Sequence, residues 1–165
     1  GVHNYSAADA YVWPADPKVR QKLEWFQDQK LALMMHWGPY SQLGIVESWA
    51  LSDADAEWSR KGIDWEASGK EFKEQYFGLN RTFNPIRFDP ERWADLAEEA
   101  GIRYLLFTTK HHDGFCMWDS RYSDYKITAE DCPFHTHKYS DICGHLFEAF
   151  RKRGIGIGAY FSKAD

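Results

Sequence analysis

The sequence predicts an α/β fold built on a parallel sheet, and two observations carry that prediction. Three short apolar and β-branched runs have the composition of strands buried on both faces: 30–35, 102–109 and 155–161. Segments with helical periodicity lie between consecutive runs, at 68–77 and 89–100 before the second run and at 139–153 before the third. Alternation of strand and helix implies right-handed crossovers and therefore parallel strands.

An aspartate followed by a proline begins the helices predicted at 17–29 and 89–100, acting as N-cap and first helical residue. Gly101 should end the second of these helices in the left-handed conformation. Helical spacing predicts its buried stripe: Trp93, Leu96, Ala97 and Ala100.

The helix at 139–153 should bury one apolar side and end at Gly154. The residues on that side are Ile142, Leu146, Ala149 and Phe150. Two passages, 39–66 and 121–138, have the composition of long loops, and a loop of this length is usually functional or carries short elements of its own.

Polar side chains directly follow the first two predicted strands. His36 follows the first, and the second is followed by Lys110, His111, His112 and Asp113. The carboxyl ends of parallel strands meet at one rim, so we expect the three histidines to lie together there.

Such a histidine cluster indicates either a metal site or a site that hydrogen-bonds a polyhydroxyl ligand. The alternating His-x-His spacing typical of metal hydrolases is absent. Successive side chains of an extended segment face opposite sides, so His111 and His112 can share one centre only if the strand has already ended. A third interpretation is that the histidines only donate hydrogen bonds to backbone carbonyls near the edge of the core.

Other side chains near these strand ends leave several roles open. Asp113 and Asp119 are candidate general acids or bases, although a carboxylate beside histidines more often orients an imidazole. Three tryptophans fall in strand-end loops, and packing in the core and stacking on a ligand are equally plausible roles for them: Trp37, Trp49 and Trp118. Cys116 is expected to be a packed thiol.

Composition excludes two classes of partner. The net charge of -5 gives no basic footprint for nucleic acid, and the longest apolar run, Leu31 to Met35, is far short of the ~20 residues of a membrane span. Aromatic residues make up 17% of the chain, which suits either a core or a surface that stacks on flat apolar faces such as sugar rings. Three cysteines without metal spacing leave the cellular compartment open.

The 165 residues could form one domain, and three strands suit either a small doubly wound sheet or the first part of a (β/α)8 barrel. A complete barrel needs about 250 residues. Because the sequence stops directly beyond the third predicted strand, we expect the barrel to be incomplete.

Three strings resemble one known family. They are FDPERWADLAEEAGIRYLLFTTKHHDGFCMWDS at Phe88 to Ser120, HWGPYS at His36 to Ser41 and GIGAYFS at Gly156 to Ser162. In this order they are similar to the family 29 glycoside hydrolases, the α-L-fucosidases. The KHHDGF string is the most specific of the matches.

The resemblance implies a catalytic (β/α)8 barrel, usually followed by a β-sandwich domain. Residues 1–165 would be the amino-terminal portion of the barrel, with 1–16 as a lead-in and the remaining strands and any sandwich outside. The implied activity is exo-hydrolysis of terminal α-L-fucose with retention of configuration, without a cofactor or metal. The implied partner is a fucosylated oligosaccharide or glycoconjugate, and the implied location is periplasmic or secreted, or lysosomal in a eukaryote.

The resemblance also assigns binding residues by position. His36, His111 and His112 would hydrogen-bond the fucose hydroxyls, and Tyr160 would lie beside the sugar. A Glu-Trp pair commonly lines the family's pocket; here the corresponding place reads Glu47, Ser48, Trp49, one residue longer.

No catalytic residue is expected within this chain. A retaining glycosidase needs two carboxyl groups roughly 5 Å apart. In the family that this chain resembles, the nucleophilic aspartate and the acid/base glutamate follow later strands, so residues 1–165 alone should hydrolyse nothing. Two alternatives stay open: a non-catalytic sugar-binding relative and a metal-dependent hydrolase.

Overall fold

The computed structural model describes residues 12–52, 57–65 and 68–163, so most of the expected lead-in, residues 1–11, lies outside the described residues. The chain divides into two compact units, Gly1–Lys30 and Leu31–Asp165. The described part of the first unit contains helix α1 (Pro17–Asp28). As predicted, Asp16 is its N-cap, and its carboxylate accepts a hydrogen bond of 2.8 Å from the Lys18 N–H.

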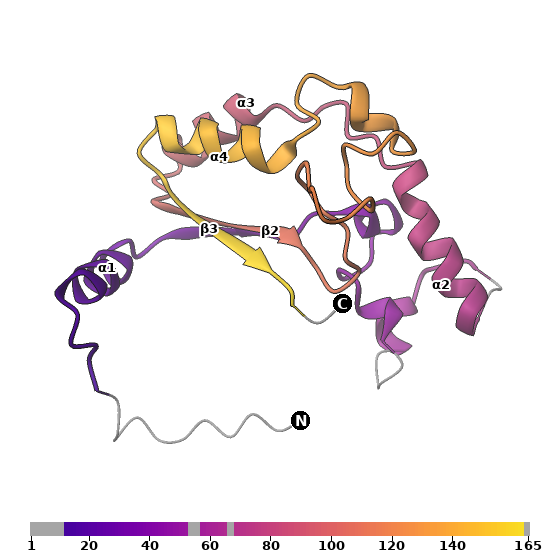
Figure 1. Cartoon of the computed structure of the whole chain (residues 1–165), viewed down its shortest axis with the longest axis horizontal. Coiled ribbons are helices and arrows are strands. Elements are labelled where there is room, and N and C mark those ends of the chain that lie inside the picture. The colour runs from indigo at the N-terminus through magenta and orange to yellow at the C-terminus, as the bar shows by residue number, and fades with distance from the viewer. Residues whose placement is uncertain (1–11, 53–56, 66–67, 164–165) are drawn as a thin grey trace. The chain divides into compact units, whose positions relative to one another are not determined.

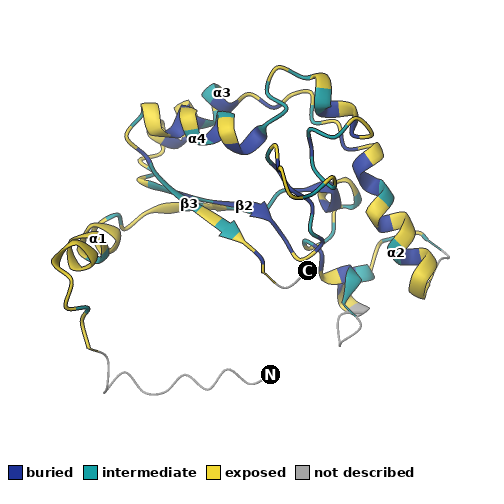
Figure 2. Cartoon of the chain, in the orientation of Figure 1, coloured by how far each residue is buried: buried dark blue, intermediate teal, exposed yellow. Residues whose placement is uncertain are grey.

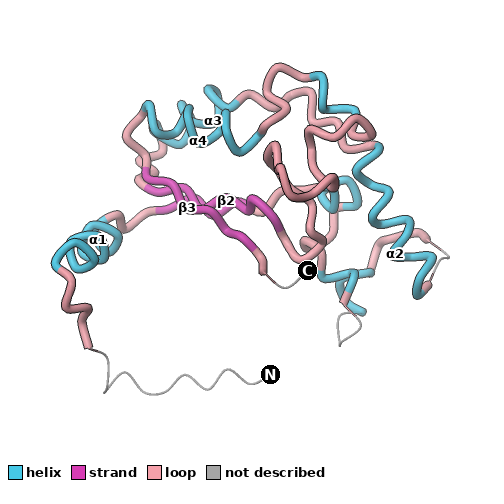
Figure 3. Tube along the Cα trace, in the orientation of Figure 1, coloured by secondary structure: helices cyan, strands magenta, loops and turns pink. Residues whose placement is uncertain are grey.

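The second unit is built on a three-stranded parallel sheet in the order β1-β2-β3 (Figure 1). The strands are β1 (Ala32–Met35), β2 (Tyr104–Lys110) and β3 (Gly156–Phe161). Their parallel pairing confirms the predicted α/β class, and the sheet is open rather than closed into a barrel. All three carboxyl ends therefore meet at one edge, and Figure 3 shows loops and short helices gathered beyond the end of β2.

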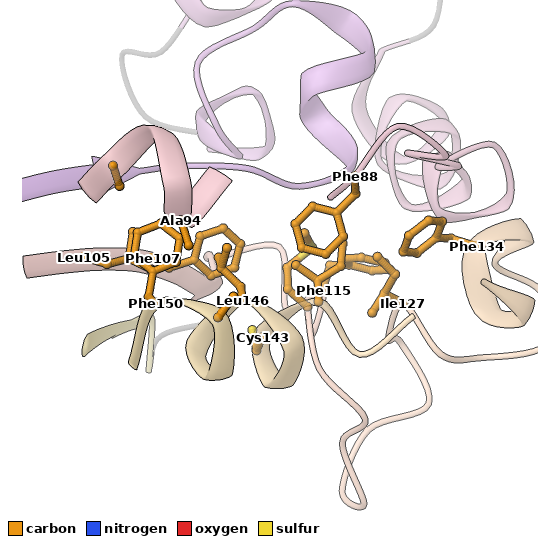
Figure 4. Close-up of a cluster of buried hydrophobic side chains, with 14 of the residues drawn as sticks. Phe88, Ala94, Leu105, Phe107, Phe115, Ile127, Phe134, Cys143, Leu146 and Phe150 are labelled. Atoms are coloured by element: carbon orange, nitrogen blue, oxygen red, sulfur yellow. The ribbon is translucent and has the colours of Figure 1, made fainter. Parts of the chain in front are cut away.

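Helices α3 (Pro90–Glu99) and α4 (Ile142–Lys152) pack side by side against one face of the sheet (Figure 1). The predicted apolar side of α4 is buried in full. In Figure 4 Leu146 and Phe150 of α4 meet Leu105 and Phe107 of β2, and Ala94 comes from α3. The sheet and the two helices therefore share one core.

The expectation that every strand is buried on both faces holds only in β2, and there only from Phe107 onward, because Tyr104 and Leu106 are half-buried (Figure 2). Neither outer strand contains a fully buried residue, and Met34 and Phe161 are about half exposed. The position of the strands contributes to this difference, since β1 and β3 each leave one edge unpaired, whereas β2 has a neighbour on both edges.

The predicted buried stripe of α3 is confirmed only in part. Ala94 and Ala97 are buried, but Trp93 is half-buried and Leu96 and Ala100 are exposed. The small alanines face the core. Leu96 and Ala100 instead line a shallow apolar groove beside β1.

The passage predicted as a loop between β1 and α2 (Gly69–Phe77) contains three short 3₁₀ helices. Their bounds are Pro39–Leu43, Trp49–Leu51 and Glu57–Arg60. A second small core holds this region together, with Tyr40, Tyr76 and Leu79 at its centre. Two more 3₁₀ helices, Gly78–Arg81 and Pro133–Thr136, lie in the other irregular passages.

Candidate functional site

Aromatic and imidazole rings from all three strand ends meet at one edge of the sheet. His36 directly follows β1, His111 directly follows β2, and Tyr160 lies within β3. The ring centroids of His36 and His111 are 5.6 Å apart, and that of His36 lies 5.0 Å from Tyr160. The rings of His111 and Tyr160 are nearly parallel, with 6.0 Å between centroids. The predicted convergence at the rim is therefore confirmed for His36 and His111, and Tyr160 lies beside them.

His112 joins this rim because β2 ends before it. The strand stops at Lys110, and the chain turns through His112 and Asp113. The two adjacent imidazoles consequently lie edge to face at 5.0 Å, with His111 buried and His112 exposed. Lys110 packs differently, since its ammonium lies 4.7 Å from the centre of the Phe161 ring.

Glu47 places a carboxylate beside both imidazoles. Its Oε1 lies 3.7 Å from Nε2 of His36, and its Oε2 lies 3.8 Å from Nε2 of His111. The indole N–H of Trp49 donates a hydrogen bond of 3.1 Å to the same Oε2. The backbone of Glu47 is in the left-handed region, with φ of 46°, which only a few per cent of non-glycine residues adopt.

Ser48 is a site residue that the sequence reasoning did not single out. Its Oγ and Nδ1 of His111 form a buried hydrogen bond of 2.6 Å. Because Nε2 of His111 faces the Glu47 carboxylate, the tautomer with its proton on Nε2 is favoured, and Ser48 then donates to Nδ1. The sequence did carry a signal for Ser48: it is the extra residue between Glu47 and Trp49, where the family that the sequence resembles commonly has a Glu-Trp pair.

His111 is held in its neutral form. Burial, with the neighbouring His112 and His36 adding to it, lowers the pKa of His111 to about 4. At neutral pH its ring therefore carries one N–H donor and one acceptor.

The two aspartates weighed as general acids or bases are both engaged elsewhere. Asp113 is buried and accepts hydrogen bonds from the Tyr76 hydroxyl at 3.0 Å and the Phe115 N–H at 3.1 Å. Burial raises the pKa of Asp113, and these donors oppose the rise. Asp119 accepts from Lys126 at 2.9 Å, and this contact lowers its pKa. Asp113 thus braces the turn that carries His111 and His112.

The Tyr40 ring packs beside the histidine cluster. Its ring centroid lies 6.1 Å from that of His111, and the side chain is buried. Burial, reinforced by the nearby Asp113 and Glu47 carboxylates, raises the pKa of Tyr40 well above its ordinary value. The hydroxyl is therefore protonated throughout the physiological range.

The three strand-end tryptophans separate into two kinds. Trp37 packs among the rings of Phe88 and Trp93, and Trp118 lies 6.0 Å from Phe161. Trp49 has 46% of its surface exposed and contacts Glu47. Trp49 is thus the most exposed of the three, and its hydrogen bond to Glu47 connects it to the histidine cluster. Cys116 is buried, as expected of a packed thiol.

Within the described ranges, one group of side chains has the geometry to hold a metal ion. His36, Glu47 and His111 each offer one ligand atom, and these atoms lie within 4.8 Å of one another. Two imidazoles and a carboxylate are a donor set that Zn²⁺ accepts. The same donors and acceptors also suit a ligand rich in hydroxyl groups.

Comparison with known proteins decides the family. A family model described as α-L-fucosidase matches residues 2–165. The chain belongs to the α-L-fucosidase family. The resemblance drawn from the three sequence strings is therefore confirmed.

Curated members of the α-L-fucosidase family match over most of the chain. It is 33% identical over 156 residues to the tissue α-L-fucosidase of Rattus norvegicus, covering 91% of this chain and 31% of the rat protein. It is 30% identical over 148 residues to a putative α-L-fucosidase of Caenorhabditis elegans, covering 86% of this chain and 28% of that protein. The chain thus spans about a third of the length of these relatives.

Solved α-L-fucosidase structures share the fold. The crystal structure of a GH29 α-L-fucosidase from Bacteroides thetaiotaomicron superposes with a TM-score of 0.67 at 32% identity, covering 92% of this chain and 31% of that one. The α-L-fucosidase AlfC from Lactobacillus casei, in complex with α-L-fucose product, gives a TM-score of 0.63 at 36% identity. The match covers 86% of this chain and 40% of that one. Among the described residues, no helix has the length and apolar character needed to cross a membrane.

Proposed function

We propose that this chain belongs to an exo-acting, retaining α-L-fucosidase that removes terminal α-L-fucose from glycans. One observation carries the proposal: in a member of this family, His36, Glu47, His111 and Tyr160 converge at the carboxyl ends of three parallel strands. Residues 1–165 are proposed to be the amino-terminal portion of the catalytic barrel, with 1–16 as a lead-in. A periplasmic or secreted location, or a lysosomal one in a eukaryote, is part of the proposal.

The proposed ligands match the chemistry of fucose. The neutral His111 imidazole can donate to one hydroxyl, and the Glu47 carboxylate can accept from another. His36 and His112 extend this set on either side of His111. Tyr160 and Trp49 supply ring faces for the apolar side of the sugar, including its methyl group.

The retaining mechanism is supported by a relative. A structure of the Bacteroides thetaiotaomicron GH29 enzyme holds a trapped covalent intermediate in complex with 2-fluoro-fucosyl fluoride. A covalent glycosyl-enzyme intermediate is the mark of retention, and it requires two carboxyl groups about 5 Å apart. We place both of these groups outside residues 1–165, because Asp113 is occupied by Tyr76 and Phe115 and Glu47 lies among sugar-binding groups.

The test uses the intact gene product and an aryl α-L-fucoside. We expect turnover on the fucoside and little turnover on aryl glycosides of other sugars. NMR should show that the fucose is first released as the α anomer. Residues 1–165 expressed alone should give no turnover. Activity on another glycoside but not on the fucoside would overturn the proposal, whereas fucose binding without any hydrolysis would indicate a non-catalytic relative.

A metal-dependent hydrolase is the second candidate, favoured by the donor set of His36, Glu47 and His111. It predicts about one equivalent of zinc by elemental analysis of the purified protein, and loss of activity after dialysis against a chelator. The fucosidase proposal predicts that chelation leaves turnover unchanged. One preparation assayed before and after dialysis separates the two.

A further inference from the structure

A second exposed tryptophan stands next to the candidate site. Trp58, on the 3₁₀ helix Glu57–Arg60, has 49% of its surface exposed, and Trp49 has 46% exposed. The two ring centroids are 6.3 Å apart, with the planes inclined by 42°. A single exposed apolar residue is ordinary, but two adjoining indoles form an apolar surface that suits a ligand.

This pair of indoles is continuous with the histidine cluster. Trp49 is tied to the cluster through its N–H, which donates to Oε2 of Glu47 at 3.1 Å. Glu47 in turn lies between His36 and His111. Trp58 therefore stands one ring farther from the proposed fucose position than Trp49 does.

The segment that carries Trp58 is anchored although the ring is exposed. The Arg60 Nε donates to the Ala50 carbonyl at 2.8 Å, and the Arg60 guanidinium lies 4.7 Å from the centre of the Phe72 ring. Ser59, directly beside Trp58, is buried. The two short helices are thus fastened to each other, so a ligand that stacks on Trp58 would not have to order the backbone first.

We propose that Trp58 is a stacking platform for the pyranose ring to which the terminal fucose is attached. This inference rests on the proposed function, and it names the part of the substrate that the histidine cluster does not reach. A pyranose presents a flat face of C–H groups, which an indole can cover and shield from water. The occupant is the neighbouring sugar of the same glycan, in line with the continuity from Glu47 through Trp49 to Trp58.

The experiment compares two substrates in the intact enzyme. One is α-L-fucosyl fluoride, whose leaving group is a single atom, and the other is a disaccharide in which α-L-fucose is linked to a hexopyranose. For Trp58→Ala we expect the ratio of kcat/KM for the disaccharide to kcat/KM for the fluoride to fall by about tenfold, the effect of removing roughly 50 Å² of apolar contact.

Two variants serve as controls. Trp58→Phe keeps a flat ring and should retain the ratio within about threefold, since most of the stacking area remains. Tyr122→Ala removes a fully exposed aromatic side chain outside the pair and should leave the ratio as it is. If Trp58→Ala melts at a lower temperature than the parent, Trp58→Leu, which keeps apolar bulk without a ring, replaces it.

An unchanged ratio in both Trp58→Ala and Trp58→Leu would overturn the inference. So would an equal loss with both substrates, because that would place Trp58 in the support of the fucose site. Failure of the parent enzyme to hydrolyse the fluoride is a different result and would refute the proposed function itself.

Discussion

The hydroxyl of Ser48 lies 2.6 Å from Nδ1 of His111, and both side chains are buried. This hydrogen bond joins the loop after β1 to the end of β2. The orientation of the His111 ring and the position of Glu47, the residue before Ser48, are therefore coupled.

Ser48→Ala should weaken both the fold and sugar binding. It leaves a buried ring nitrogen without its partner, so we expect the free energy of unfolding to fall by about 1–2 kcal/mol. In the intact enzyme KM for an aryl fucoside should rise severalfold, because the ring is no longer held. Urea unfolding and steady-state kinetics measure the two effects.

Ser123→Ala is the matched control for that change. Its hydroxyl also takes part in a hydrogen bond, here as acceptor from the Tyr125 N–H at 3.2 Å, and the structure gives it no contact with His111. This variant should lose some stability with KM unchanged. Equal rises in KM for both serine variants would mean that the Ser48 contact has no specific role in binding.

The low pKa of His111 predicts a stability that falls on acidification. The folded-state pKa is about 4, compared with 6.5 for an ordinary imidazole, so between these pH values the unfolded chain binds a proton that the folded chain does not. The free energy of unfolding should therefore rise with pH through this window and level off above it. At about 1.4 kcal/mol per pKa unit, the interval from 6.5 to about 4 corresponds to about 3–4 kcal/mol.

Urea unfolding of the intact protein at several pH values between 4.5 and 7 would measure this effect. His111→Gln cannot titrate, so its stability should depend on pH less steeply, by about one proton, than that of the parent. Parallel pH dependences for the two proteins would contradict an unprotonated His111 in the folded state.

Tyr76 and Tyr125 offer a matched pair of buried hydroxyls. The Tyr76 hydroxyl donates to Asp113 at 3.0 Å, whereas that of Tyr125 has no hydrogen-bond partner in the part of the chain that is described. Tyr76→Phe should therefore lower the free energy of unfolding by about 1–3 kcal/mol, since it strips a donor from a buried carboxyl group. Tyr125→Phe should be neutral or slightly stabilising.

The measurement is chemical unfolding of both variants, together with Asp113→Asn alone and the double variant Tyr76→Phe/Asp113→Asn. If the hydroxyl acts through Asp113, the two changes should not add. Similar losses in the two Tyr→Phe variants would show that ring packing, rather than the hydrogen bond, accounts for the effect.

Gly38 in the HWGPY segment is required for space rather than for backbone freedom. Its backbone is extended, but a Cβ added there would come within 2.8 Å of the Tyr40 ring, which in turn packs near His111. Gly38→Ala should cost about 1–3 kcal/mol and raise KM by displacing that ring. Gly78→Ala, with right-handed helical backbone and open space around its Cβ, should be neutral or stabilising. Equal stabilities for the two alanine variants would contradict this account.

The parts of the fold that follow from local chemistry were predictable from sequence. Asp16 and Pro17 begin α1, Asp89 and Pro90 begin α3, and Gly101 ends α3 with φ of 75°, each through an interaction within a few residues. The convergence of His36 and His111 also followed, because it requires only that the strands be parallel.

Features that depend on long-range packing were not predictable in this way. Leu96 matches the helical stripe yet is exposed, whereas Ala94, which the stripe did not include, is fully buried in the core. Ser48 acquires its role from a partner 63 residues away. The brace between Tyr76 and Asp113 likewise depends on a tertiary contact that spacing does not encode.

The left-handed backbone of Glu47 lowers the stability of the fold at a position whose carboxylate is proposed to bind the sugar. A non-glycine residue there costs about 1–2 kcal/mol, so Glu47→Gly would relieve the backbone while removing the carboxylate that faces two imidazoles. Selection for folding alone would favour glycine or asparagine at this position. Under the proposed function, the carboxylate that would accept hydrogen bonds from the sugar is therefore held at a cost in backbone energy.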